Sequence, residues 1–163
     1  MQGSRQYHEP HTTMKTISKA TLNDIPQLAD LLCLLFTQEA DFQPDVETQC
    51  TGLRRIIENP DAGTILVLRD GPAVVGMVNV LYTISTACGG RVAIIEDMVV
   101  RPEHRGQGAG TSLLQGAIDL ARAAGCRRIT LLTDRTNASA IRFYRRHSFV
   151  MSEMIPLRLE QLP

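Results

Sequence analysis

The chain has 163 residues, an apolar fraction of 44%, and 17 basic side chains that balance 17 acidic ones. This length fits one compact α/β domain and argues against a second full domain. The charge balance argues against a nucleic-acid-binding protein, which needs a basic surface to neutralise phosphates, but it allows a small anion held by a few backbone amides.

Residues 1–13 are polar and irregular, which predicts a disordered N-terminal extension followed by a single domain over 14–163. Thr16–Ala20 is a short alternating segment typical of a strand. Asn23 and Asp24 are good N-caps for a helix whose apolar residues follow helical spacing to about Thr37.

The remaining elements follow from apolar periodicity and from the glycine and proline residues that interrupt it. We expect, in chain order, the helix Val46–Glu58, the strands Thr64–Leu68, Ala73–Tyr82 and Arg91–Val100, the helix Gly108–Ala124 with Gly125 as its C-terminal cap, the strand Arg128–Thr133, the helix Asn137–Arg146, and one or two closing strands within Phe149–Leu159. This order predicts an α/β fold with a mixed central sheet of about six to seven strands and about four helices, because regular strand–helix alternation is absent.

No stretch approaches the ~20 apolar residues of a membrane span, and the N-terminus lacks the apolar core of a signal peptide. The four cysteines are scattered, with no C-x-x-C pair and no histidines at metal-ligand spacing. We therefore expect a soluble, cytoplasmic protein with no metal site and with no nucleic-acid or membrane partner.

A glycine-rich loop, Arg105–Gly110, lies between the β-branched strand and the following helix. Its amides and those of the first helical turn can converge on an anion, and glycines let the backbone approach phosphate oxygens. The G-x-G-x-x-G register of dinucleotide folds fails, since Thr111 and Leu113 stand where glycine is needed, and the lysine of a P-loop is absent. A glycine turn without a ligand is the other interpretation.

Arg105-x-x-Gly108-x-Gly110 matches the R/Q-x-x-G-x-G/A signature of the GNAT superfamily of acetyl-CoA-dependent N-acetyltransferases. The segment Asn137–Phe149 resembles the family pattern N-x-x-A-x-x-F-Y-x-x-x-G-F, with Ser148 where glycine is usual. The chain therefore resembles this superfamily over about Arg91–Val150, and the resemblance implies a GNAT-like acyl-CoA N-acyltransferase fold.

The resemblance also implies roles for individual residues. The pyrophosphate of CoA would be cradled by Arg105, Gly106, Gln107, Gly108, Ala109, Gly110 and Thr111. The backbone of Met98, Val99 and Val100 would pair with the pantetheine arm as an added strand. Asn137 would contact pantetheine, and Tyr144 would protonate the departing thiolate.

Asn137 and Tyr144 are seven positions apart, so both lie on one face of a helix. A phenol can donate a proton to a developing thiolate. Asn137 could equally cap its helix, and Tyr144 could be an ordinary edge of an apolar core.

The acceptor amine must lose a proton before it attacks, because an alkylammonium with a pKa near ~10 is protonated at neutral pH. Glu96 is the first candidate base, since it interrupts an apolar strand. Asp97 is the alternative, on the opposite face unless a bulge rotates the strand. A buried structural pair or an ordered water chain is also compatible with these residues.

These features predict direct acetyl transfer from acetyl-CoA to a primary amine of a small molecule or peptide in a ternary complex. The alternative is a catalytically silent acyl-CoA-binding or interaction module on the same fold. The acidic loop Thr37–Asp45, with Glu39, Asp41 and Phe42, favours a cationic amine, unless it is simply a solvated loop. A homodimer resembles family habit, and the apolar segment Met151–Leu159 could serve it.

Overall fold

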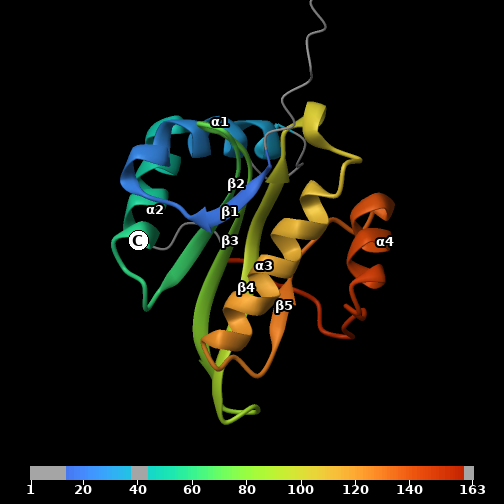
Figure 1. Ribbon diagram of the computed structural model, residues 1–163. Coiled ribbons are helices and arrows are strands. Elements are labelled where there is room, and N and C mark those ends of the chain that lie inside the picture. The colour runs from blue at the N-terminus through green and yellow to red at the C-terminus, as the bar shows by residue number, and fades with distance from the viewer. Residues whose placement is uncertain (1–13, 38–43, 160–163) are drawn as a thin grey trace, which may run out of the picture. The chain divides into compact units, whose positions relative to one another are not determined.

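The computed structural model describes residues 14–37 and 44–159 (Figure 1). The predicted extension over 1–13 and the loop residues Glu39, Asp41 and Phe42 lie outside the described residues. The chain divides into two compact units, Met1–Leu131 and Leu132–Pro163, and each is described by itself.

A five-stranded sheet in the order β1-β2-β3-β4-β5 forms the framework of the first unit. Its strands are β1 (Thr16–Lys19), β2 (Gly63–Asp70), β3 (Ala73–Ser85), β4 (Gly90–Val100) and β5 (Ile129–Leu131). Neighbouring strands are antiparallel except β4 and β5, which are parallel. The sheet is mixed, as predicted, but the prediction of six to seven strands is wrong.

The missing strands are those predicted within Phe149–Leu159, which the structure describes as irregular chain. Two local features oppose a strand there. Pro156 has no N–H to give to a ladder. The Ser152 hydroxyl accepts a hydrogen bond from the Met154 N–H at 3.1 Å, which gives the backbone a local alternative to strand pairing.

Four α-helices are present among the described residues, in agreement with the predicted number. They are α1 (Ile25–Phe36), α2 (Val46–Ile57), α3 (Ala109–Ala123) and, in the second unit, α4 (Ala138–Arg146); η1 (Leu22–Asp24) and η2 (Pro102–His104) are short 3-10 turns. In the first unit, α1 and α2 cover one face of the sheet and α3 the other (Figure 1).

The helix ends explain why these boundaries could be predicted. Asp45 caps α2 by accepting a hydrogen bond from the Thr48 N–H at 3.1 Å, so this member of the acidic loop has a structural role. Gly125 ends α3 at φ 73, and the Cys126 N–H donates to the Ala121 carbonyl at 2.9 Å. This pattern is a Schellman cap, which requires the left-handed conformation that glycine adopts without strain.

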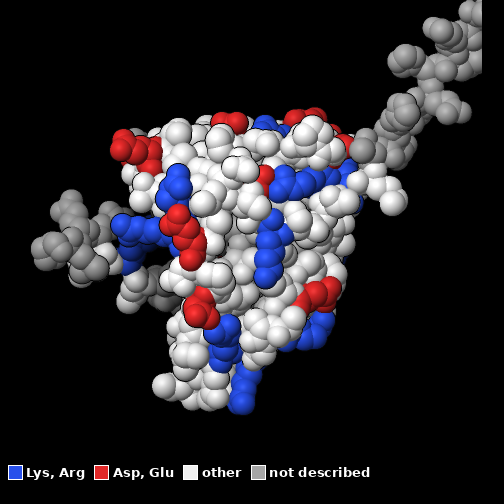
Figure 2. Space-filling view, turned by 60° about the vertical axis from the view of Figure 1, so that its left-hand side comes forward, with Lys and Arg blue, Asp and Glu red and all other residues white. Residues whose placement is uncertain are grey.

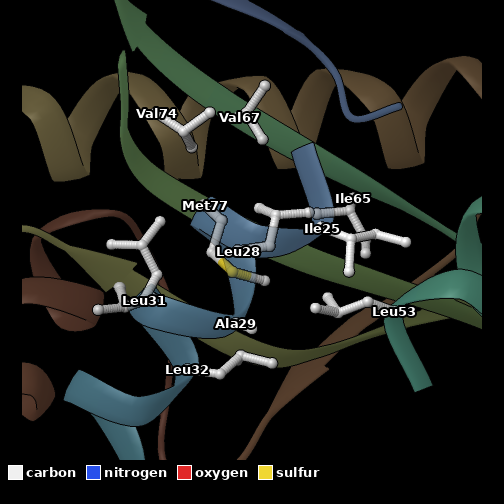
Figure 3. Close-up of a cluster of buried hydrophobic side chains, with 11 residues drawn as sticks. Ile25, Leu28, Ala29, Leu31, Leu32, Leu53, Ile65, Val67, Val74 and Met77 are labelled. Atoms are coloured by element: carbon white, nitrogen blue, oxygen red, sulfur yellow. The ribbon is translucent and has the colours of Figure 1, made fainter. Parts of the chain in front are cut away.

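The main apolar core lies between α1, α2 and the sheet (Figure 3). It is built from Ile25, Leu28, Ala29, Leu31 and Leu32 of α1, Leu53 of α2, Ile65 and Val67 of β2, Val74 and Met77 of β3, and Val99 of β4. Because Leu28 and Leu31 are fully buried, cutting either to alanine would cost about 2–5 kcal/mol. On the opposite face, Leu113 of α3 packs on Gly76, where a Cβ atom would lie only 2.9 Å from the Leu113 Cδ1.

A buried ion pair joins the start of α1 to β2. The Asp24 carboxylate accepts hydrogen bonds from both terminal nitrogens of Arg69, at 2.9 and 2.8 Å, and from the Thr21 N–H at 2.7 Å. The sequence predicted Asp24 as a helix cap, but its side chain bonds back to Thr21 and across to Arg69. The hydrogen bonds from Arg69 are the main reason that the pKa of Asp24 lies below its usual range.

We predict that Arg69→Met lowers the free energy of unfolding by about 3 kcal/mol at neutral pH, because Asp24 would remain buried without its partner. A lowered folded pKa gives stability that is present above the unfolded value of about 3.9 and is lost as the pH falls through the folded pKa. Urea unfolding should therefore show the difference between wild type and variant shrinking in acid. A difference that is independent of pH would contradict this account.

Candidate active site

The glycine-rich loop connects η2 to α3 and leaves backbone amides at the start of the helix. Gly106 and Gly108 have φ of 73° and 80°, and a Cβ atom at either would meet nothing within 4 Å. The first main-chain bond of α3 runs from the Ser112 N–H to the Gly108 carbonyl at 2.9 Å. The amides of Ala109 and Gly110 therefore precede the helical ladder, which is the arrangement of an anion-binding helix N-terminus.

Side chains around this loop add positive charge. The Arg105 Nε donates to the Val100 carbonyl at 2.8 Å, so this guanidinium lies against the end of β4. The Lys15 ammonium, which precedes β1, donates to the Gln107 Oε1 at 3.0 Å. Lys15 was not among the predicted site residues, because nothing local in the sequence relates it to a loop 92 positions away.

The end of β4 extends beyond the ladder that this strand forms with β5. Its ladder with β5 stops at the pair Ile95–Leu131. Toward β3, the Arg101 N–H donates to the Val75 carbonyl at 2.8 Å. In an antiparallel pair every second residue bonds to the partner strand, so this bond shows which residues of β4 face β3. Met98 and Val100 therefore direct their backbone groups away from β3, whereas Val99 directs its own toward β3.

Just before this end, β4 contains a bulge. Val78 pairs with Met98 and Val80 pairs with Ile95, so Glu96 and Asp97 together lie opposite the single residue Asn79. The side chain of Asn79 points to the α1/α2 face, since its neighbour across the sheet, Ile65, belongs to that core.

The bulge decides where the two carboxylates point. Ile95 and Met98 pair with Val80 and Val78, whose side chains lie on the α3 face, opposite to that of Asn79. Side chains alternate along a strand, so Glu96, which follows Ile95, lies on the opposite face from Ile95. Asp97, which precedes Met98, lies on the opposite face from Met98. Both carboxylates therefore lie on the same face as Asn79. The sequence allows Asp97 as the base only if a bulge turns it to the face of Glu96, and the structure has this bulge.

Asp97 is the carboxylate with the perturbed environment. The Asn79 Nδ2 donates to the Asp97 Oδ2 at 3.3 Å, and Asn79 is only 4% exposed. Burial raises the pKa of Asp97 and the negative charge of Glu96 raises it further, whereas the hydrogen bond from Asn79 lowers it. Glu96 itself is exposed. A partly buried carboxyl with a raised pKa binds a proton more tightly than an exposed one, which suits it to accept a proton.

The second unit holds the other two predicted residues. Asn137 has φ −78° and ψ 70°, and its side chain accepts a hydrogen bond from the Ala140 N–H at 3.0 Å, so it is the N-cap of α4. The Tyr144 ring makes edge contacts with Phe143 and Phe149, at centroid distances of 5.2 and 5.9 Å. Burial raises the pKa of Tyr144, which keeps its phenol protonated at neutral pH.

Comparison with known proteins decides the family. A sequence model of the acetyltransferase (GNAT) family matches residues 25–149, most of the chain. The protein belongs to the GNAT family. It is therefore an acetyltransferase, and the donors of this family are acyl-CoA thioesters.

Individual relatives agree with this assignment. The aminoalkylphosphonate N-acetyltransferase of Salmonella typhimurium is 32% identical over 133 residues, which cover 82% of this chain and 83% of that protein. An integron cassette protein from the mobile metagenome of Cole Harbour Salt Marsh superposes with a TM-score of 0.78, at 26% identity, over 90% of this chain and 91% of its own. An aminoglycoside N-acetyltransferase solved with CoA shares the fold, with a TM-score of 0.80 at 14% identity over 95% of this chain and 100% of its own.

Three further features of the described part of the chain are its potential metal ligands, the length of its helices and its surface charge. In the part of the chain that the structure describes, no three His, Cys, Asp or Glu residues gather as a group that could hold a metal ion. Among the same residues, none of the helices is long and apolar enough to span a bilayer. Basic and acidic side chains are interspersed on the face drawn in Figure 2, in keeping with the balanced charge.

The structure of the GNAT motif around α4 yields a prediction about stability. Ser148 stands where the family pattern has glycine, and it is the one non-glycine residue with a left-handed backbone (φ 67°) among those described. Ser148→Gly should raise the free energy of unfolding by about 0.5–1 kcal/mol, because the strain relieved exceeds the added chain entropy. Ser148→Ala, which keeps the strain, is the control in urea unfolding. A glycine variant no more stable than the alanine variant would contradict this account.

Proposed function

We propose that the protein transfers the acetyl group of acetyl-CoA to a primary amine of a small molecule, by direct attack of the amine on the thioester. The observation that carries the proposal is the bulge in β4. The bulge holds the Asp97 carboxyl, which is suited to take a proton. Directly after it come the end of β4, where Met98 and Val100 direct their backbone groups away from β3, and the glycine loop that begins α3.

The residues around the loop fit the donor. The left-handed Gly106 and Gly108, with open space where side chains would be, let the backbone approach a pyrophosphate. We assign this contact to Arg105–Thr111, with Lys15 close by. Met98 and Val100 would pair with the amide groups of the pantetheine arm, Val100 through its N–H because its carbonyl accepts from Arg105. Val99, whose backbone faces β3, would support them from the core. Asn137, as a cap, would keep its amide nitrogen for the same ligand.

The carboxylates serve the acceptor. An alkylammonium gives one proton to Asp97, and the neutral amine then attacks the thioester carbonyl. We favour Asp97 over Glu96, the first candidate from the sequence, because Asp97 is partly buried and bonded to Asn79, whereas Glu96 is exposed. In this scheme Glu96 contributes negative charge that attracts the ammonium and increases the proton affinity of Asp97.

Tyr144 is our candidate for the proton donor to the departing thiolate, as the family resemblance implies. Its raised pKa keeps the phenol protonated until the thiolate forms. The relative from Salmonella typhimurium is named for an aminoalkylphosphonate, a small primary amine, which supports the same acceptor class here. The homodimer and the cytoplasmic location stay predictions of the sequence.

The loop assignment predicts the effect of two matched substitutions. Gly108 and Gly125 lie at opposite ends of α3 with φ of 80° and 73°, and a Cβ at either has open space. Glutamate at either position should cost similar backbone strain. Acetyl-CoA at about 100 times its Kd should stabilise the wild type and Gly125→Glu by about 2.7 kcal/mol, seen as a rise in Tm. Gly108→Glu should lose this rise, and an unchanged rise in that variant would remove the loop from the site.

The transfer itself is tested by release of CoA thiol across a panel of amines that includes aminoalkylphosphonates, diamines, amino acids, N-terminal peptides and aminoglycosides. We expect turnover with at least one small primary amine. Tyr144→Phe should lower kcat by about 10²-fold or more while the Kd of acetyl-CoA stays near the wild-type value, since the phenol acts only on the leaving group. Binding of acetyl-CoA without release with any amine would favour the silent module instead.

A further inference from the structure

Asn79 is a polar residue within the apolar segment Val74–Leu81 of β3. It follows Met77 and Val78 and precedes Val80, three residues that are fully buried, and it is itself 4% exposed. Its Nδ2 donates to Asp97, but its Oδ1 is buried without a hydrogen-bond partner among the described residues. A buried carbonyl without a donor costs about 1–3 kcal/mol, so the Oδ1 of Asn79 lowers the stability of the fold.

The bulge in β4 places Asn79 opposite two residues instead of one. As the one β3 residue opposite both Glu96 and Asp97, it contacts the carboxyl that the proposed reaction uses. Its Nδ2–H bond favours the ionised carboxylate against the effect of burial. Proteins keep locally destabilising residues mainly at functional sites, so the bond from Asn79 to a candidate functional carboxyl suggests a role in function.

Other titratable side chains lie on the elements that form this layer, on the α1/α2 face of the sheet. They are Asp24 of η1, Asp30 and Cys33 of α1, Glu47, Cys50, Arg54 and Arg55 of α2, Arg69 of β2, and Glu96 of β4. Of the described groups, Glu96 and Asn79 are the ones that act on the ionisation of Asp97, besides burial itself. The balance between these three effects therefore sets the pH at which Asp97 becomes a carboxylate.

We propose that Asn79 is a positioning residue for acetyl transfer, which holds the Asp97 carboxylate in the bulge and keeps it ionised, ready to accept the proton of the acceptor amine. This inference rests on the proposed function. Of the three protons of the ammonium, one goes to Asp97 and then to solvent, one leaves the nitrogen as the amide forms, and one stays on the amide. The thiolate that departs takes its proton from Tyr144, which the second released proton restores.

The test compares Asn79→Leu with Gln49→Leu. Gln49 of α2 is the matched control, because it is also a buried amide. Its Nε2 lacks a partner among the described residues, and its Oε1 accepts a hydrogen bond from the Cys33 Sγ at 3.5 Å. Gln49→Leu should keep or raise the wild-type Tm, whereas Asn79→Leu should change it little, because the lost hydrogen bond to Asp97 offsets the removal of the unsatisfied carbonyl. In Asn79→Leu alone, the acid limb of kcat/KM should move to higher pH, with about tenfold loss on that limb, since a hydrogen bond to a charged group is gone.

A second measurement does not depend on turnover. The ¹³C signal of the Asp97 carboxyl, followed against pH, should titrate at higher pH in Asn79→Leu than in the wild type and Gln49→Leu. An unshifted titration in Asn79→Leu, or an equal shift in Gln49→Leu, would overturn the inference. If no amine is acetylated, the proposed function fails, and the carboxyl titration decides whether Asn79 controls Asp97.

Discussion

The bulge in β4, where two residues face Asn79 across the sheet, is the constraint on which the rest of the site depends. A strand without it would send Glu96 and Asp97 to opposite faces. With it, both carboxylates face the layer of α1 and α2, and the strand leaves its parallel partner β5 at the same point. One extra residue thus directs the candidate base and lies directly before the part of β4 that would pair with the pantetheine arm.

This arrangement opposes stability locally. A partly buried carboxyl with a neighbouring negative charge and a buried amide carbonyl without a donor all favour unfolding. The same face of the sheet compensates with a continuous apolar core in which Leu28, Leu31 and Met77 are fully buried. The fork of hydrogen bonds between Arg69 and Asp24 fixes the start of α1 on β2, so the helix layer over the site is held at its N-terminal end.

Much of the fold could be predicted because its signals are local. Gly125 at the end of α3, Asp45 at the start of α2 and the turn at Gly71 (φ 58°) are all positions where one residue type satisfies one backbone geometry. The closing strands were wrongly predicted because apolar composition outweighed Pro156, which cannot donate to a ladder. Whether a segment pairs at all depends on a distant partner, which composition does not reveal.

Some features of the candidate site could also be predicted from local sequence, and others could not. The glycine loop and the Asn137–Tyr144 segment are visible as motifs, whereas the bulge arises from pairing between strands and has no signature in Ile95–Met98. Asn79 could have been noticed as the one polar residue among apolar neighbours, but its contact with Asp97 becomes clear only from the register of the two strands. The contact of Lys15 with the loop has no sequence signal at all.

The most direct test of the central claim is the pH dependence of kcat/KM for Asp97→Asn and Glu96→Gln, measured by release of CoA thiol at saturating acetyl-CoA. If the bulge presents Asp97 as the proton acceptor, Asp97→Asn loses the acid limb and falls by about 10²-fold or more. Glu96→Gln should keep that limb and move it to lower pH, because a neighbouring negative charge is gone. An Asp97→Asn variant with the wild-type profile, beside a Glu96→Gln variant that has lost it, would contradict the account.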